Sequence, residues 1–291
     1  MDINWFPGHM AKSRRELLDN LKRADLVLEI CDARLPKSSR HPDLAGILQR
    51  KPVWTILGKA DLADPFCSKL WLEMAAEREQ TWLAMDLFFE PDLKVLRDML
   101  REFNAKALEL AKAKGKKISP LRIIVAGIPN TGKSTLINRL VGKKTAQTSN
   151  KPGVTRKLRW VKGGTDFEVL DTPGILAPKL DTGEAKINLA ATGAIPDDIL
   201  PLEDVAFALF TSLLQTYPRL MKSRYDVSAQ KEDAERVDHV DYWEIFQQAA
   251  IKRNCLAKGG SPDIDRFNKM LLQEFRSGKI GRISLEFPPE N

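Results

Sequence analysis

The feature that most constrains the fold of this 291-residue chain is the segment Gly127-Ile-Pro-Asn-Thr-Gly132-Lys133-Ser134, which fits the pattern G-x-x-x-x-G-K-[S/T]. It follows an apolar run at 121–126 with the character of a strand, and it precedes an apolar helix-like segment at 135–141. A glycine-rich turn between a strand and a helix directs main-chain N–H groups and the positive end of the helix toward phosphate. The segment therefore predicts a phosphate-binding loop in an α/β domain.

The residue types in this loop suggest separate roles. Lys133 is expected to reach the β- and γ-phosphates, and the Ser134 hydroxyl is expected to bind Mg²⁺. Further nucleotide contacts are expected from Pro129, Asn130, Thr131, Gly132 and Thr135.

Two segments beyond the loop complete the predicted phosphate and metal site. Asp171-Thr-Pro-Gly174 follows a strand-like run at 167–170, so Asp171 can hold the Mg²⁺ shell and the Gly174 amide can reach the γ-phosphate. Thr155 lies in a loop-like stretch and is a candidate second hydroxyl ligand that becomes ordered with the γ-phosphate. An ordinary loop threonine is the alternative interpretation.

The base-recognition motif stands in an unusual place. Guanine is commonly selected by an Asn/Thr-Lys-x-Asp motif after a strand, yet none follows Gly174. The candidate is Gly58-Lys59-Ala60-Asp61, directly after the strand-like run 52–57, with Asp61 pairing the base and the Lys59 stem packing on its ring. Such a short motif is common by chance, and its position at a strand end is what supports it. The base motif then precedes the phosphate motif, which implies a circular permutation.

The remaining patterns predict a two-domain chain. Strand-like runs alternate with helical segments, as in a mostly parallel sheet with helical crossovers. The expected strands are 24–31, 52–57, 81–85, 121–126 and 167–170, and the expected helices between them are 68–80 and 91–110. After a boundary near 180, strand signals give way to amphipathic helices at 202–217, 241–254 and 263–275. We therefore expect a nucleotide-binding domain over 1–180 and a small all-α domain over 181–291.

Composition sets weaker limits. A net charge of +7 and a pI near 9.2 suit an acidic partner such as nucleic acid, although many enzymes are equally basic. The lysine-rich stretch 111–122 fits either a solvated linker or a nucleic-acid contact. Three scattered cysteines cannot form a disulfide framework or a zinc cluster. Without a signal peptide or a membrane-length apolar run, a cytoplasmic location without membrane contact is expected.

Over nearly its whole length the chain resembles the circularly permuted GTPases of the YlqF type. The motifs that carry the resemblance are the opening WFPGHMAKSRRE and the segments 32–40, 59–64, 127–140, 151–155, 170–176, 189–200 and 275–286. The resemblance implies a monomeric GTPase that binds the assembling large (50S) ribosomal subunit and promotes its late maturation. Its helical domain would contact ribosomal RNA. The candidate phosphate contacts there are Lys269, Arg276, Lys279 and Arg282, with a merely solvated basic face as the alternative.

The resemblance also bears on hydrolysis. Ile175 stands where many GTPases carry a water-positioning glutamine, and an aliphatic side chain cannot orient water. Similar proteins assign that role to the histidine of the opening motif, here His9, although the residues alone suggest a plain surface histidine. Asn130 matches a loop asparagine that helps to coordinate K⁺ in related GTPases.

Two departures from the family pattern concern base recognition. Gly58 replaces an asparagine that ties the base motif to the phosphate loop, and Asp86 and Leu87 occupy the second base-contacting loop without its usual Ser-Ala. These changes leave phosphate binding intact and weaken the expectation of guanine selectivity. They also keep open a nucleotide-gated RNA-binding scaffold that hydrolyses little GTP. A tRNA-modifying or translational GTPase has no additional catalytic motif to support it.

Overall fold

The chain folds into two compact units. The computed structural model describes residues 19–40, 51–113, 115, 120–142, 159–163, 166–171, 183–199, 201–228 and 241–289. The first unit comprises Met1–Asp181 together with Ser284–Asn291, and the second comprises Thr182–Ile283. The last residues of the chain are thus grouped with the first unit, whereas the sequence pattern assigned all of 181–291 to one domain. The division into functional domains stays a prediction.

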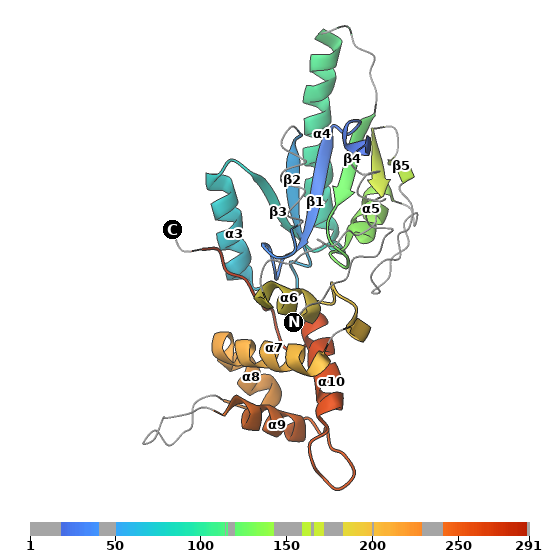
Figure 1. Ribbon diagram of the computed structural model, residues 1–291. Helices are drawn as coiled ribbons and strands as arrows, with labels where there is room; N and C mark the ends of the chain where they lie inside the picture. The colour runs from blue at the N-terminus through green and yellow to red at the C-terminus, as the bar shows by residue number, and fades with distance from the viewer. Residues whose placement is uncertain are drawn as a thin grey trace. The chain divides into compact units, whose positions relative to one another are not determined.

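A six-stranded sheet of order β3-β2-β1-β4-β6-β5 forms the centre of the first unit (Figure 1). The strands are β1 Leu26–Asp32, β2 Val53–Gly58, β3 Thr81–Met85, β4 Leu121–Ala126, β5 Arg159–Gly163 and β6 Phe167–Asp171. β5 runs antiparallel to β6, and the other pairs in the sheet are parallel. Parallel strands end at the same edge, so the loops after β1, β2, β3, β4 and β6 all leave from one edge of the sheet.

The predicted strands are confirmed, and one further strand was not predicted. β1, β2, β3, β4 and β6 match the expected runs to within one or two residues. β5 was missed because its residues mix charged and apolar side chains, as in Arg159, Trp160 and Lys162. That pattern suits an edge strand and carries little hydrophobic signal.

Successive side chains of β1 pack on opposite faces of the sheet. Leu28 and Ile30 share a core with the helices α4 (Glu90–Ala113) and α5 (Lys133–Val141). Cys31 shares another core with α3 (Pro65–Glu77), which therefore packs against the opposite face. α3 begins earlier than predicted because the Asp64 carboxylate accepts the N–H groups of the first turn and Pro65 suits that position.

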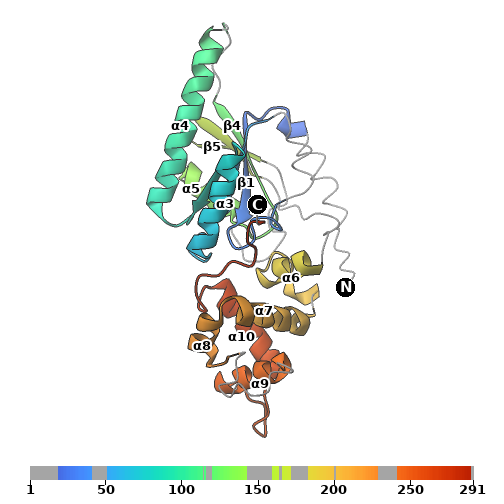
Figure 2. The same ribbon diagram turned by 90° about the vertical axis from the view of Figure 1, so that its left-hand side faces the viewer.

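Helices make up the second unit (Figure 2). They are α6 Gly183–Ala191, the 3₁₀ turn η1 Asp197–Ile199, α7 Leu202–Thr216, α8 Pro218–Tyr225, α9 Tyr242–Lys252 and α10 Ile264–Arg276. The predicted helices α7, α9 and α10 are confirmed, whereas α6 and α8 are too short to give a clear periodic signal. Aromatic rings join them: the centroid of Phe246 lies 5.0 Å from that of Phe210 and 4.9 Å from that of Phe267.

A buried carboxylate, Glu274 on α10, ties three elements of this unit together. It is 5% exposed and accepts hydrogen bonds from the Nε of Arg224 at 3.0 Å, the hydroxyl of Tyr225 at 2.9 Å and an Nη of Arg253 at 2.9 Å. Burial alone would raise the pKa of Glu274. The hydrogen bonds from Arg224 and Tyr225 and the two guanidinium charges outweigh burial and hold the pKa below its usual value. The stability that ionised Glu274 contributes is therefore fully present above the pH at which a carboxyl group ordinarily titrates. It is lost as the pH falls through the lowered pKa of Glu274.

Replacing Glu274 by glutamine is expected to lower the free energy of opening of the second unit by about 3 kcal/mol, since two guanidinium groups lose their counter-charge in a buried site. Hydrogen exchange of α8 and α10 peptides measures this opening. Glu203→Gln, at an exposed position in the first turn of α7, is the matched control and should cost under about 1 kcal/mol. Equal effects of the two substitutions would contradict the role assigned to Glu274.

Candidate nucleotide-binding site

The glycine-rich segment forms a tight loop between β4 and α5. The backbone adopts a positive φ of 60° at Asn130 and of 103° at Gly132, where α5 begins. Such left-handed residues within a turn bring successive main-chain N–H groups to one side and create a concave anion site. The predicted phosphate loop is thus built between the strand and the helix that the sequence indicated.

Close main-chain packing explains the glycines. A Cβ at Gly127 would lie 2.3 Å from the carbonyl oxygen of Ile30, and a Cβ at Gly132 would lie 2.8 Å from a methyl group of Leu87. Larger residues would push the loop away from the ends of β1 and β3. The loop is therefore held against the carboxyl edge of the sheet.

Lys133 places a cation within this loop. Its side chain is only 7% exposed, and its ammonium group donates to the carbonyl oxygen of Ile128 at 2.5 Å. The Thr131 hydroxyl donates to the same carbonyl oxygen at 3.0 Å. The ammonium group and the turn of main chain therefore converge on one small volume, which is the arrangement that binds phosphate.

The base motif lies directly beside the phosphate loop. Gly58 ends β2, and a Cβ on it would lie 3.1 Å from the carbonyl oxygen of Thr131. Lys59 has a φ of 58°, and the N–H of Ala60 donates to the carbonyl oxygen of Met85 at 3.1 Å. The fold thus joins two motifs that are distant in the sequence, and the exposed Asp61 follows at the same edge.

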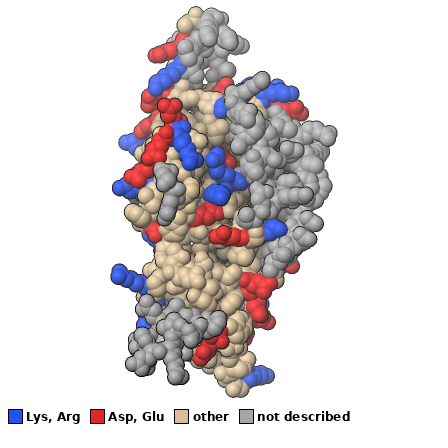
Figure 3. All heavy atoms as spheres, turned by 60° about the vertical axis from the view of Figure 1, so that its left-hand side comes forward, with Lys and Arg blue, Asp and Glu red and all other residues tan. Residues whose placement is uncertain are grey.

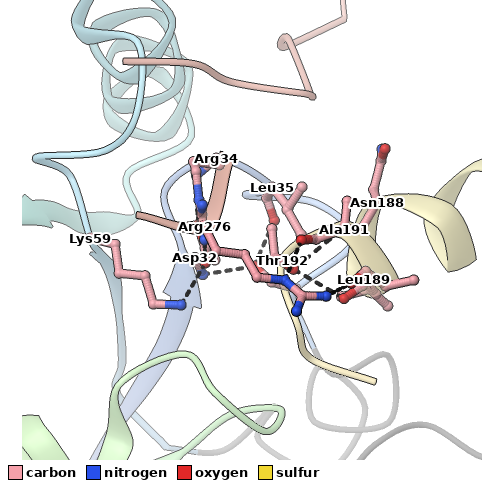
Figure 4. Close-up of polar contacts among 11 residues, drawn as sticks. Asp32, Arg34, Leu35, Lys59, Asn188, Leu189, Ala191, Thr192 and Arg276 are labelled. Atoms are coloured by element: carbon pink, nitrogen blue, oxygen red, sulfur yellow. Dashed lines mark hydrogen bonds and ion pairs between the residues drawn. The ribbon is translucent and has the colours of Figure 1, made fainter. Parts of the chain in front are cut away.

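An ion cluster behind Lys59 was not singled out by the residue pattern. The Asp32 carboxylate, at the end of β1, accepts from the Nε and Nη of Arg34 at 2.9 and 2.8 Å and from the Lys59 ammonium at 3.0 Å (Figure 4). Arg34 and Asp32 are 1% and 3% exposed. The only sequence signal was the segment 32–40, in which an aspartate at the end of a strand stands two residues before an arginine.

The charges in this cluster perturb each other. Burial opposes ionisation of Asp32, but Arg34 and Lys59 outweigh it and hold the pKa of the carboxyl well below its usual range. Burial lowers the pKa of Lys59, and the adjacent Asp32 offsets part of that change. The carboxylate consequently stays charged, and the Lys59 stem is fixed at its ammonium end.

The loop after β3 is held by its own side chains. The Asp86 carboxylate accepts the N–H of Phe88 at 2.8 Å, and the N–H of Asp86 donates to Asp92 at 2.8 Å. Leu87 is 4% exposed and packs in the core. Nucleotide contacts by Asp86 and Leu87 stay a prediction.

Two of the candidate metal ligands, Ser134 and Asp171, lie among the described residues. Asp171 ends β6 in register with Val125 of the neighbouring β4, at the edge from which the phosphate loop leaves, and Ser134 lies in the first turn of α5. His9, Thr155 and Gly174 lie outside the described residues. Among the described residues no His, Cys, Asp or Glu cluster could enclose a metal ion.

The candidate RNA contacts differ in their surroundings. Lys269, Lys279 and Arg282 are exposed. Arg276 instead donates to the carbonyl oxygens of Ala190 and Ala191, each at 2.9 Å, and pairs with Asp197 at 2.7 Å. These bonds give Arg276 a structural role at the end of α6. On the face drawn in Figure 3, basic and acidic side chains are interspersed.

A phosphate loop with its lysine, beside a Lys-x-Asp motif on a parallel α/β sheet, defines the class of phosphate-loop GTPases. The family model described as 50S ribosome-binding GTPase matches residues 122–229. The chain is 41% identical over 288 residues to ribosome biogenesis GTPase A of Bacillus pumilus, covering 99% of both chains. It therefore belongs to the ribosome biogenesis GTPase A family.

Solved structures agree with this assignment. A GDP-bound structure of TM YlqF matches with a TM-score of 0.64 and 25% identity, over 95% of this chain and 100% of that one. The GNP-bound structure of YlqF from T. maritima matches with a TM-score of 0.63 and 25% identity, over 96% and 100%. The fold predicted from the sequence is thereby confirmed. No helix within the described part of the chain has the length and apolar character to cross a bilayer.

Two glycines at the ends of α5 give a matched test of the phosphate loop. Gly132 and Gly142 both have positive φ. A Cβ at Gly132 would meet Leu87, whereas no described residue lies within 4 Å of a Cβ at Gly142. Each alanine variant should lose about 1 kcal/mol of stability from backbone strain. Only Gly132→Ala should also weaken nucleotide binding, by at least about tenfold in a calorimetric titration. Equal affinities in the two variants would argue against this loop as the binding site.

Proposed function

We propose that this protein binds GTP and hydrolyses it to GDP and phosphate while it is bound to the assembling large ribosomal subunit, whose late maturation it promotes. The observation that carries the proposal is the buried Lys133 ammonium inside a glycine-rich loop, with the Lys59–Asp61 motif directly beside that loop. The names of the relatives support the ribosomal part.

Base recognition is assigned to the loop after β2. The Asp61 carboxylate accepts N–H donors of the guanine edge, and the Lys59 stem packs on the ring while Asp32 holds its ammonium group. Gly58 contributes only main chain, so it adds no side-chain bond between this loop and the phosphate loop.

Mg²⁺ is assigned to Ser134, Thr155 and Asp171, and the register of β6 with β4 supports the inclusion of Asp171. When bound there, the metal ion would neutralise negative charge on the phosphate groups. Lys133 adds a second positive charge at the same groups. Asn130, in its left-handed conformation at the rim of the loop, is assigned to a K⁺ ion that would raise turnover.

Hydrolysis requires a water molecule in line with the γ-phosphate. Because Ile175 offers no polar group, His9 is assigned to orient this water. With Ile175 unable to orient water, intrinsic turnover should be low, and the ribosomal particle is expected to raise it by fixing His9 in place.

The second unit is assigned to ribosomal RNA, with Lys269, Lys279 and Arg282 as phosphate contacts. Arg276 is the weakest of the four candidates, because its guanidinium already bonds Asp197 and the end of α6. A monomer acting on ribosomal precursors in the cytoplasm fits these assignments. The absence of a side chain at Gly58 favours, as a second candidate, a nucleotide-gated scaffold that hydrolyses little GTP.

Turnover with and without large ribosomal subunits separates these two functions. We expect GTP hydrolysis to rise at least about tenfold with the subunits, which corresponds to about 1.4 kcal/mol of barrier. His9→Ala should abolish the rise, and His239→Ala is the control of the same residue type. A GTP hydrolysis rate that stays low whether or not subunits are added would favour the scaffold.

Gly58→Asn tests the base assignment. An asparagine amide can bond across to the phosphate loop and is expected to tighten GDP binding by up to about tenfold. Gly58→Ala is the matched control, since its Cβ crowds the Thr131 carbonyl oxygen at 3.1 Å without adding an amide. Tighter ADP binding, with GDP unchanged, would contradict guanine recognition.

A further inference from the structure

The residues that follow the helical unit return to the nucleotide-binding unit. The chain enters the second unit at Thr182, leaves it at Ile283, and joins the first unit again from Ser284 onward. We call Ser284–Glu286 the tail segment. Ser284 is 1% exposed, so this part of the chain is packed into the first unit.

The tail segment binds the loop after β1. The Glu286 carboxylate accepts the main-chain N–H groups of Lys37 at 2.8 Å and Ser38 at 3.0 Å. The N–H of Leu285 donates to the carbonyl oxygen of Arg34 at 2.9 Å. A carboxylate that receives two main-chain N–H groups fixes a loop strongly, since hydrogen bonds to charged groups exceed neutral ones in strength.

The tail segment also binds the loop after β2 and the helix that this loop leads into. The Ser284 hydroxyl accepts the N–H of Asp64 at 3.2 Å, at the end of the base loop. The carbonyl oxygen of Glu286 accepts the Trp71 indole N–H at 3.0 Å and the Cys67 thiol at 3.1 Å. The tail segment therefore joins the two loops that enclose Lys59.

A continuous set of contacts runs from the tail segment to the base motif. Arg34, whose carbonyl oxygen is bonded by the tail, places its guanidinium on Asp32, and Asp32 holds the ammonium group of Lys59. The Ser39 hydroxyl, in the stretch that Glu286 binds, accepts the N–H of Asp32 at 3.0 Å. A shift of this loop would therefore move the anchor of Lys59.

We propose that Glu286 is a positioning residue for base selection: by clamping the loops after β1 and β2, it holds Lys59 and Asp61 in the geometry that recognises guanine. This inference rests on the proposed function, because it assigns the tail segment to the same base site. No nucleotide contact is assigned to Glu286. This residue acts on selectivity through main-chain hydrogen bonds.

The test compares two substitutions and two shortened chains. Glu286→Ala removes both carboxylate bonds, whereas Glu286→Gln retains an amide oxygen that can accept one or both N–H groups. A chain ending at Ile283 loses the tail segment, and a chain ending at Phe287 keeps it. For each full-chain or shortened protein, calorimetry gives the dissociation constants of GDP, ADP and inorganic triphosphate.

The ratio of the ADP to the GDP dissociation constant is the decisive quantity. We expect Glu286→Ala and the chain ending at Ile283 to lower this ratio by about tenfold, a change of about 1.4 kcal/mol in discrimination. Triphosphate affinity should stay unchanged. Glu286→Gln should restore part of the ratio, and the chain ending at Phe287 should match the unaltered protein.

Three results would overturn the inference. The first is a ratio that Glu286→Ala leaves unchanged, and the second is an equal loss of GDP, ADP and triphosphate binding, which would mean general destabilisation. In both cases guanine selectivity of the unaltered protein still stands. In the third, the unaltered protein itself fails to prefer GDP over ADP; then the proposed base recognition fails, and the role of Glu286 fails with it.

Discussion

The contact between Gly127 and the main chain of Ile30 sets the geometry of the nucleotide edge. With no room for a Cβ between them, the phosphate loop is fixed against the end of β1, which lies between β2 and β4 in the sheet. The same closeness brings the Thr131 carbonyl oxygen against Gly58. Phosphate and base motifs therefore sit side by side because parallel strands end at one edge and glycine lets their loops touch.

A buried charge cluster anchors Lys59 at this edge at an energetic cost. Removing Asp32 and Arg34 from water is unfavourable, and their mutual attraction offsets that cost only with well-formed bonds. The two parallel bonds between them provide such geometry, and Lys59 supplies the third partner. An apolar cluster of the same volume would stabilise the sheet equally well, but it would leave the Lys59 ammonium without an anchor. The cluster is better explained by the position of Lys59 than by stability.

The sequence predicted those parts of the site whose chemistry is local. A glycine loop between a strand and a helix needs only neighbouring residues, so the loop around Lys133 and the core strands were predictable. β5 was not, because an edge strand with Arg159 and Lys162 carries little hydrophobic pattern. The engagement of Arg276 with Asp197, and of Glu286 with Lys37, depends on residues far apart in the sequence. Contacts of that kind leave no periodic pattern in the sequence from which they could be predicted.

Permutation gives the second unit two covalent connections to the nucleotide edge. One follows β6, whose last residue, Asp171, is the candidate magnesium ligand, and leads to Thr182. The other is the tail segment, which returns from Ile283 to the loops around Lys59. In a GTPase domain with the usual motif order, the base motif would follow the phosphate motif within one continuous stretch. Here the helical unit is joined through the chain to both the phosphate side and the base side of the candidate site. Under the proposed function, a ribosomal partner bound to that unit would be linked through the chain to both sides of the site, and each link is a route by which binding can bias nucleotide contacts.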